Sequence, residues 1–361
     1  MRDFLAAHFD LLVTLVKVGA IVNLMLLGVG QLTWLERKLS AWLQDRIGPN
    51  RVGPFGLLQF LADGIKFITK EEIIPAQANK LLYNLAPVIA VICGLSTIAV
   101  VPLGPDFKIN LLGGERVISL TIAPGASFGL LWVLALTSMG VYAIMLAGWA
   151  SNSKYPQLGG LRSTAQIISY EIAMGLAIVP VVMKAGSLSL AAIIDSQSGW
   201  GWNLFSPQAL GFLIFMTASF AETNRLPFDL PEGEAELVGG YHTEYSGMKF
   251  ASFFMAEYAN MMVAACMMVV LFFGGWRMPW MHGGGGSGGV TEAVSLFSAL
   301  AGVIWFSLKV FAFLFFFIWV RWTLPRFRYD QLMKLGWVYF IPMALINLAM
   351  AAVWLFWFRN S

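Results

Sequence analysis

Long apolar runs constrain this chain more than any other feature of its sequence. A helix needs about 20 apolar residues to cross the hydrocarbon core of a bilayer. Only 12% of the residues are charged, against roughly 25% in soluble domains. We therefore predict an all-α polytopic membrane protein, one transmembrane domain over residues 1–361, with about eight spans, near residues 11–33, 81–102, 126–149, 164–183, 207–223, 250–275, 296–320 and 336–358.

The basic residues predict an orientation for these spans. Most lysines and arginines fall in the loops after the first, third, fifth and seventh runs. Because such loops stay on the cytoplasmic side, both termini are expected on the opposite side. The net charge of +3 then follows from topology and does not indicate nucleic-acid binding. The run at 11–33 is too long for a signal-peptide core, so we expect it to remain in the mature protein.

Residues 55–70 predict an amphipathic helix lying at the membrane surface. Leu57, Leu61 and Ile65 recur at helical spacing, while Asp63 and Lys66 occupy another face. Two roles fit this pattern. The helix could attach the chain to the membrane surface, or it could form a wall of the entrance through which a lipid-like ligand reaches its site.

Several kinds of site are not predicted in this chain. The glycine-rich stretch 281–290 has no phosphate-binding pattern and is typical of a flexible loop. Cys93 and Cys266 lie inside predicted spans, where they are expected as small buried apolar residues. Two cysteines cannot supply the four ligands that an iron–sulfur cluster usually takes. We therefore predict no dinucleotide, metal or cluster site in this chain alone.

Ionisable residues inside the spans indicate function, because each costs roughly 2.5 to 3.5 kcal/mol near the bilayer centre. Glu171 and Glu257 have apolar residues on both flanks, and Lys309 lies within another span. Glu222, at the inner end of the fifth span, is followed by Arg225 at a spacing that allows the two to pair along one helix face.

Acidic residues are concentrated in the inner loop at 224–249 and just before it. Pro231 and the pair Gly239 and Gly240 suit the start and end of a short helix over 231–240. Such a helix would place Glu232 and Glu236 on one face, where like charges disfavour simultaneous ionisation. The loop is either a solvated acidic surface or a proton-exchanging cluster. The six carboxylates of residues 221–245 are Glu222, Asp229, Glu232, Glu234, Glu236 and Glu244.

Four long motifs resemble one known family over nearly the whole chain. They are WLERKLSAWLQDRIGPNRVGPFGLLQFLADGIKFITKE at 34–71, AGWASNSKYPQLGGLRSTAQIISYE at 147–171, AETNRLPFDLPEGEAELVGGYHTEYSGMKFASFFMAEY at 221–258 and LPRFRYDQLM at 324–333. They are similar to the H-subunit family, called subunit 1 in mitochondria, of proton-pumping NADH:quinone oxidoreductase, respiratory complex I.

This resemblance implies a membrane subunit that forms much of a quinone-access chamber and an acidic path into the membrane arm. It implies a quinone substrate, with ubiquinone favoured over menaquinone, and FMN and iron–sulfur clusters in partner subunits. A bacterial inner membrane is favoured over the mitochondrial one, with periplasmic termini. The matching chamber residues are Glu36, Arg37, Asp63, Lys66, Arg225, Tyr245, Phe254 and Arg326. The matching path residues are Glu171, Glu222, Asp229, Glu232, Glu234, Glu236, Glu244 and Glu257.

The resemblance also suggests a coupling hypothesis. Charge that develops on the quinone headgroup would alter the pairing of Arg225 with the acids of residues 229–236. The change would then pass through Glu222, Glu171 and Glu257 toward the pumping subunits.

Three alternatives remain at the level of sequence. A homologous subunit of an energy-converting hydrogenase would copurify with a nickel–iron subunit instead of a flavin subunit. A stand-alone cation/proton antiporter would transport when reconstituted by itself. A purely structural anchor would tolerate neutral replacements of the buried carboxylates.

Overall fold

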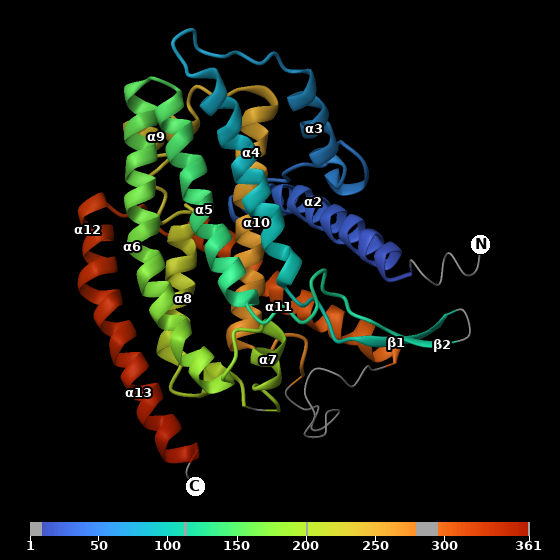
Figure 1. Cartoon of the computed structure of the whole chain (residues 1–361). Coiled ribbons are helices and arrows are strands. Elements are labelled where there is room, and N and C mark those ends of the chain that lie inside the picture. Colours follow the sequence, from blue (N-terminus) through green and yellow to red (C-terminus); the bar gives the residue numbers. More distant parts are fainter. Residues whose placement is uncertain (1–8, 112–113, 200, 279–294, 360–361) are drawn as a thin grey trace.

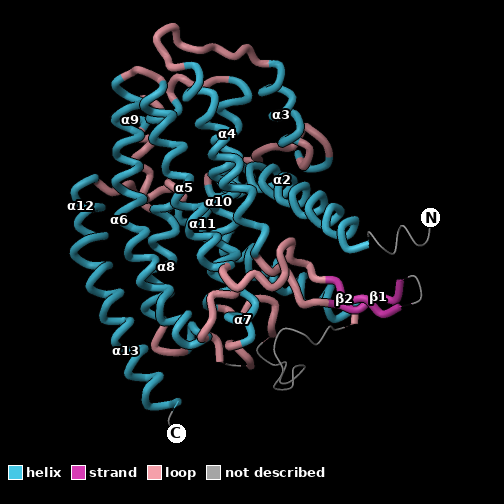
Figure 2. Tube along the Cα trace, viewed as in Figure 1, coloured by secondary structure: helices cyan, strands magenta, loops and turns pink. Residues whose placement is uncertain are grey.

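The computed structural model describes residues 9–111, 114–199, 201–278 and 295–359, and most of this part is helical. Figure 1 shows long helices side by side, and Figure 2 shows that the strands are confined to one small hairpin. The helices are α2 (Phe9–Leu43), α3 (Gln59–Thr69), α4 (Lys80–Ser96), α5 (Gly129–Ala150), α6 (Lys154–Ala185), α7 (Leu190–Asp195), α8 (Ala209–Glu222), α9 (Glu234–Leu237), α10 (Gly247–Phe272), α11 (Leu296–Thr323), α12 (Tyr329–Lys334) and α13 (Ile341–Arg359).

The prediction of an all-α polytopic membrane protein is confirmed. Among the described residues, 7 helices are long and apolar enough to cross a membrane. The fifth predicted span, 207–223, corresponds to α8, which has only 14 residues. At 1.5 Å per residue it is about 21 Å long, shorter than the hydrocarbon core of about 30 Å. A turn of 3-10 helix, Asn203–Phe205, precedes it.

The first span is longer than its apolar run suggested. The helix α2 continues past Thr33 to Leu43 and carries Glu36 and Arg37 in its last turns. Figure 1 shows α2 crossing obliquely to the upright helices, with α3 close beside it. The close approach depends on Gly30, because a Cβ there would lie 2.6 Å from the ring of Phe60 in α3.

The predicted surface helix is present as α3, and its first part is replaced by a turn of 3-10 helix at Pro54–Gly56. Its apolar residues Leu61, Ile65 and Ile68 are 50%, 64% and 70% exposed. Asp63, on the other face, turns toward α2 and is largely covered. An outward apolar face of this kind fits a helix lying along a membrane surface.

A hairpin that the sequence did not predict lies in the loop between α4 and α5. Its strands, β1 (Phe107–Leu111) and β2 (Gly114–Ile118), pair antiparallel. Figure 1 shows the hairpin away from the α3 end of the bundle.

The helix α10 forms the centre of the bundle (Figure 1). It contacts α2, α3, α4, α7, α8 and α11. Its second half, from Met267 to Phe272, is buried almost completely. Cys266 in α10 and Cys93 in α4 are buried and free, as predicted. Because α10 also carries Glu257, its packing fixes that carboxylate inside the bundle.

Lys309 in α11 binds backbone carbonyls at the end of α10 that lies away from the acidic loop. Its Nζ donates to the carbonyl oxygens of Phe273 at 2.7 Å, Gly275 at 2.9 Å and Arg277 at 2.9 Å. The ammonium also lies 4.5 Å from the ring centroid of Trp202. A cation at the carboxyl end of a helix is favoured by the helix dipole. This lysine therefore has a structural role and is not part of the acidic group of residues.

Replacing Lys309 with methionine is expected to lower thermal stability. The change leaves the three carbonyls without this donor, at roughly 1 to 3 kcal/mol for each buried group left unsatisfied. The unfolding temperature of the detergent-solubilised protein measures the effect. Lys17→Met is the control, because its Nζ donates to a single carbonyl, that of Thr121, at 3.3 Å. Equal unfolding temperatures for the two variants would contradict the assigned role.

Candidate functional site

A buried group of ionic side chains is centred on Arg225, in the loop after α8. Its Nη1 lies 3.0 Å from Glu36 Oε2, and its Nε lies 2.6 Å from Glu257 Oε1. The side chains of Arg225, Glu36 and Glu257 are 4%, 6% and 13% exposed. One guanidinium therefore joins a carboxylate of α2 to a carboxylate of α10.

Two further residues complete this group. Arg321, on the last turn of α11, forms an ion pair with Glu36. The hydroxyl of Tyr258 donates to Glu36 Oε2 at 2.7 Å, and the Arg225 guanidinium carbon lies 4.3 Å from the Tyr258 ring centroid. Two arginines thus face two carboxylates, and this balance is what permits charges at such depth. Although burial lowers the pKa of Arg225, Glu257 and Glu36 together raise it well above its usual value.

The predicted pairing of Glu222 with Arg225 is wrong. The helix α8 ends at Glu222, and Asn224 takes a left-handed conformation with φ 51°. The chain therefore turns before Arg225, which reaches Glu36 and Glu257 instead. Glu222 forms a hydrogen bond with the side chain of Thr137 in α5.

The turn after α8 is held by Gln166 of α6. Its Nε2 donates to the carbonyl oxygens of Ala221 at 2.8 Å and Phe228 at 2.7 Å. Further along, the loop folds back on itself where Gly240, with φ +63°, meets the Pro231 carbonyl. A Cβ at Gly240 would lie 1.6 Å from that oxygen, so only glycine fits. These contacts fix the position of Arg225 and of the acids that follow it.

A second charged cluster joins α2 to α3. Arg37 Nη1 lies 2.6 Å from Asp63 Oδ2, and Lys66 Nζ lies 3.6 Å from Asp63 Oδ1. Arg37 directly follows Glu36 in α2, so this cluster lies beside the Arg225 group along the same helix.

The acidic loop does not form the predicted helix over 231–240. Only Glu234–Leu237 is helical, because Gly233 (φ 32°) and Val238 (φ 67°) interrupt it. Glu232 and Glu236 therefore do not share a helix face. Glu236 is exposed and pairs with Arg162 at 2.6 Å, whereas Glu232 turns inward near His242. The side chain of Glu234 lies outside the described part of the structure.

Asp229 of this loop is buried, and Glu232 is largely covered. Asp229 Oδ2 lies 2.8 Å from Arg326 Nη2, and burial raises the pKa of Asp229 despite that arginine. Burial, with Glu257 and Asp229 nearby, raises the pKa of Glu232 to about 8. Burial lowers the pKa of His242 to about 4. The loop therefore holds at least one carboxyl group that can exchange a proton near neutral pH.

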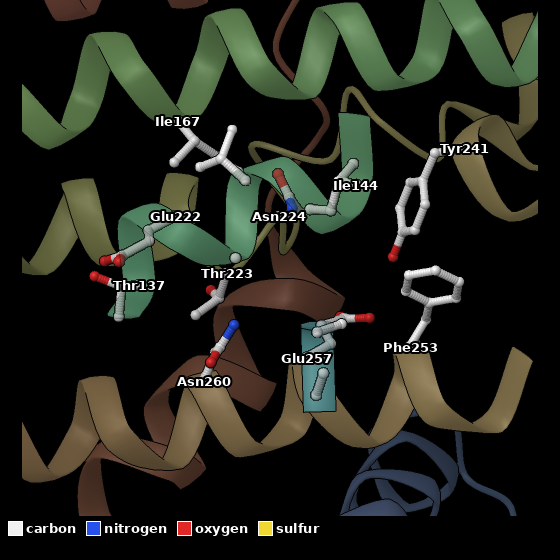
Figure 3. Close-up of a pocket in the computed structure, with 14 residues that line it drawn as sticks. Thr137, Ile144, Ile167, Glu222, Thr223, Asn224, Tyr241, Phe253, Glu257 and Asn260 are labelled. Carbon is white, nitrogen blue, oxygen red and sulfur yellow. The ribbon is translucent and has the colours of Figure 1, made fainter. Parts of the chain in front are cut away.

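Glu171 in α6 and Glu222 at the end of α8 each meet a hydroxyl group of α5. The Ser138 hydroxyl of α5 donates to Glu171 in α6. Glu222 and Glu257 both line a cavity of about 40 Å³. Figure 3 shows Glu222 and Thr137 at one end of it, with Glu257, Tyr241 and Phe253 at the other.

The remaining predicted site residues lie around the end of the loop. Tyr245 stacks on Tyr83 of α4 with ring centroids 4.0 Å apart, and its hydroxyl donates to the Tyr83 carbonyl at 3.1 Å. The Tyr83 hydroxyl donates to the Glu244 carbonyl at 2.6 Å. Phe254, half-buried, packs against His242 with ring centroids 5.9 Å apart. Tyr245 and Glu244 are thus anchored to α4, apart from the Arg225 group.

Comparison with known proteins identifies the family. The family model described as "NADH dehydrogenase" matches residues 16–352. An NADH-quinone oxidoreductase H subunit of Koribacter versatilis is 49% identical over 354 residues, covering 95% of this chain and 97% of that protein. The corresponding H subunit of Leptospira biflexa is 51% identical over 352 residues, covering 96% of each chain. This chain belongs to the H-subunit family of NADH-quinone oxidoreductases.

As a member of the H-subunit family, the chain is a multi-pass membrane subunit of respiratory complex I. Sequence reasoning missed four polar residues of its candidate site: Arg321, Tyr258, Thr137 and Asn260. Arg321 belongs to the basic residues of the predicted inner loops. Its position one residue past the predicted seventh span could have indicated a charged residue at the membrane edge. The other three follow no local pattern, because their partners lie on other helices.

Glu232 predicts a pH dependence for the stability of this H-subunit family member. Its pKa is raised from 4.5 to about 8, so the folded chain holds this proton more tightly than the unfolded chain between those values. Stability should therefore fall as pH rises through that window. In Glu232→Gln this contribution is absent, and the unfolding temperature should fall less steeply with pH. Glu72→Gln, which alters an exposed carboxylate paired with Lys249, is the control. Parallel curves for wild type and Glu232→Gln would contradict the prediction.

Proposed function

We propose that this chain borders the quinone chamber of NADH-quinone oxidoreductase and connects that chamber to an acidic path through the membrane arm. The observation that carries the proposal is the position of Arg225 between Glu36 and Glu257. Glu36 belongs to the set expected at the chamber, and Glu257 to the set expected along the path. A single guanidinium that contacts both can transmit a change of charge from one to the other.

The proposed chamber lies where α2, α3 and the start of α10 meet. Charged groups of both signs are present there: Glu36 with Arg225, Asp63 with Arg37 and Lys66, and Asp229 with Arg326. Phe254 adds an aromatic surface. The substrate is a quinone, with ubiquinone favoured and menaquinone possible. Tyr245 remains a proposed chamber residue, although its ring and hydroxyl are engaged by Tyr83.

Reduction of a quinone adds electrons and takes up protons at its headgroup. Negative charge that develops there attracts the nearby guanidinium groups. Glu36 is held by two of them, those of Arg225 and Arg321. If Arg225 moves toward the headgroup, Glu257 loses its cation. A buried carboxylate without a cation is strongly disfavoured, so Glu257 then takes up a proton.

This scheme differs from the coupling hypothesis based on sequence, in which Arg225 changes its pairing with the acids of residues 229–236. Arg225 pairs with Glu36 and Glu257, whereas Asp229 pairs with Arg326. The proposed change of charge therefore reaches Glu257 directly, without a step through the acidic loop.

Protons reach and leave Glu257 through the other carboxylates of the path. On the membrane side, Glu222 lines the same cavity as Glu257, and Glu171, which accepts a hydrogen bond from Ser138, follows Glu222 along the proposed path. On the loop side, the carboxylates of the inner loop form the proposed acidic entrance from the inner surface. They are Asp229, Glu232, Glu234, Glu236 and Glu244.

The proposed partners are other subunits of complex I. Peripheral-arm subunits supply FMN and iron–sulfur clusters, which deliver electrons to the quinone, and small membrane-arm subunits lie adjacent. The proposed location is a bacterial inner membrane with both termini periplasmic, because the basic residues gather in the loops on the acidic-loop side.

Purification of the complex from native membranes tests this function. We expect a flavin subunit that oxidises NADH, together with bound quinone. A nickel–iron subunit in its place would favour the energy-converting hydrogenase, whose homologous subunit is the second candidate. Cation/proton exchange by the reconstituted chain alone would favour the antiporter. Either outcome would contradict the proposal.

A further inference from the structure

Two adjoining cavities meet beside Glu222 in the middle of the bundle. The larger has a volume of about 40 Å³ and the smaller about 20 Å³. One water needs roughly 10 to 15 Å³ by this measure, so the larger cavity has room for a few waters and the smaller for about one. Four residues line both cavities: Thr137, Glu222, Thr223 and Asn260.

Asn260 lies between the two carboxylates that the larger cavity connects. It is three residues after Glu257 in α10, about one helical turn further along the same face. Figure 3 shows Thr223 and Asn260 between Glu222 with Thr137 on one side and Glu257 on the other. A water chain from Glu257 to Glu222 therefore passes Asn260.

The chemistry of this junction differs from that of the Arg225 group. An arginine only donates hydrogen bonds, so it favours an ionised carboxylate. The amide of Asn260 and the hydroxyl of Thr137 can each donate and accept. They can therefore bind water in either orientation, and they can serve a carboxyl group with or without its proton. A site through which protons pass needs this property.

We propose that Asn260 is a positioning residue that, with Thr137, orders the waters joining Glu257 to Glu222. The proposal rests on the proposed function. It adds the residues that connect Glu257 with Glu222 along the acidic path. When the Glu257 carboxyl releases its proton, the nearest water accepts it while the last water of the chain donates one to the Glu222 carboxylate. The waters return to neutral, and one proton has moved from Glu257 to Glu222.

Asn260→Leu is the direct test, because leucine has the branched shape of asparagine but forms no hydrogen bond with water. Complex in native membranes is assayed for NADH:quinone turnover, proton translocation and the solvent isotope effect in D2O. NADH:ferricyanide activity, which needs only the flavin subunit, measures the amount of complex. We expect turnover to fall by at least about tenfold, since positioned proton transfer contributes typically 10² to 10⁴. Asn260→Ser, which keeps a hydroxyl and leaves room for a water, should recover most of the turnover.

A matched control and a second pair of variants keep the test decisive. Asn347→Leu makes the same change at a buried asparagine of α13 that lines neither cavity. It should leave turnover and the isotope effect unchanged. Thr137→Val removes the hydroxyl from the other wall, and Thr137→Ser keeps it. This pair decides the question if Asn260→Leu fails to assemble, with loss expected in the first and near-normal turnover in the second.

Two results would overturn the inference. One is wild-type turnover and isotope effect in Asn260→Leu or, if that variant does not assemble, in Thr137→Val. The other is an equal loss in Asn347→Leu, which would show a general packing effect. If these variants are active while Glu257→Gln is inactive, only this inference fails. If Glu257→Gln is also fully active and coupled, the proposed function fails.

Discussion

Arg225→Met is expected to lower the stability of the subunit, because removing one partner of a buried ion pair costs roughly 3 to 5 kcal/mol, and to reduce NADH:quinone turnover strongly. Methionine approximates the length of the side chain but leaves Glu257 without its ion-pair partner and Glu36 with Arg321 as its remaining arginine. In the proposed scheme this also removes the group that links the chamber to the path. Turnover is measured in native membranes and normalised to NADH:ferricyanide activity.

Arg225→Lys should retain part of the turnover. Lysine keeps the charge, but its ammonium lacks the planar fork with which Arg225 contacts two carboxylates through different nitrogens. Arg328→Met is the control, because Arg328 is exposed and pairs with Asp330 at the surface. Exposed pairs contribute about 0 to 1 kcal/mol. Wild-type turnover in Arg225→Met would contradict the central role of this residue.

Glu257→Gln is expected to abolish both quinone-coupled turnover and proton translocation. Glutamine keeps the size of the side chain and an oxygen facing Arg225, but it can neither carry charge nor exchange a proton. Glu234→Gln should produce the same loss if the loop is the entrance of the path. Both variants are assayed in inside-out vesicles by NADH:quinone turnover and by acidification of the interior.

Glu72→Gln is the control for these two variants, because it neutralises an inner-side carboxylate outside the proposed path. It should leave turnover and acidification unchanged. Full coupled turnover in both Glu257→Gln and Glu234→Gln would contradict the acidic path.

The fold was largely predictable because apolar runs report directly on helices that cross a membrane. The apolar runs could not predict where a helix ends, because polar residues can extend a helix beyond its apolar run. The helix α2 extends to Leu43, and one face of its last turns, with Glu36, Ser40 and Ala41, is buried in the bundle. The helix expected over 231–240 shortens to Glu234–Leu237, because Gly233 and Val238 leave the helical conformation and Gly240 packs tightly against Pro231.

The candidate site was less predictable, because its contacts join residues far apart in the chain. Spacing along one helix suggested Glu222 as the partner of Arg225, whereas the observed partner Glu36 is 189 residues away. The resemblance supplied Glu36 as a chamber residue without its partner. Asn260 and Thr137 have uncharged side chains inside apolar runs, so nothing in the sequence distinguished them from ordinary span residues.

The central claim is that quinone reduction changes the protonation of Glu257 through Arg225. Infrared difference spectroscopy of the purified complex, recorded between oxidised and reduced quinone, measures it most directly. We predict a change in a carboxylic acid C=O band that is missing in Glu257→Gln and weakened or shifted in Arg225→Lys. An identical difference spectrum in wild type and Glu257→Gln would contradict the claim.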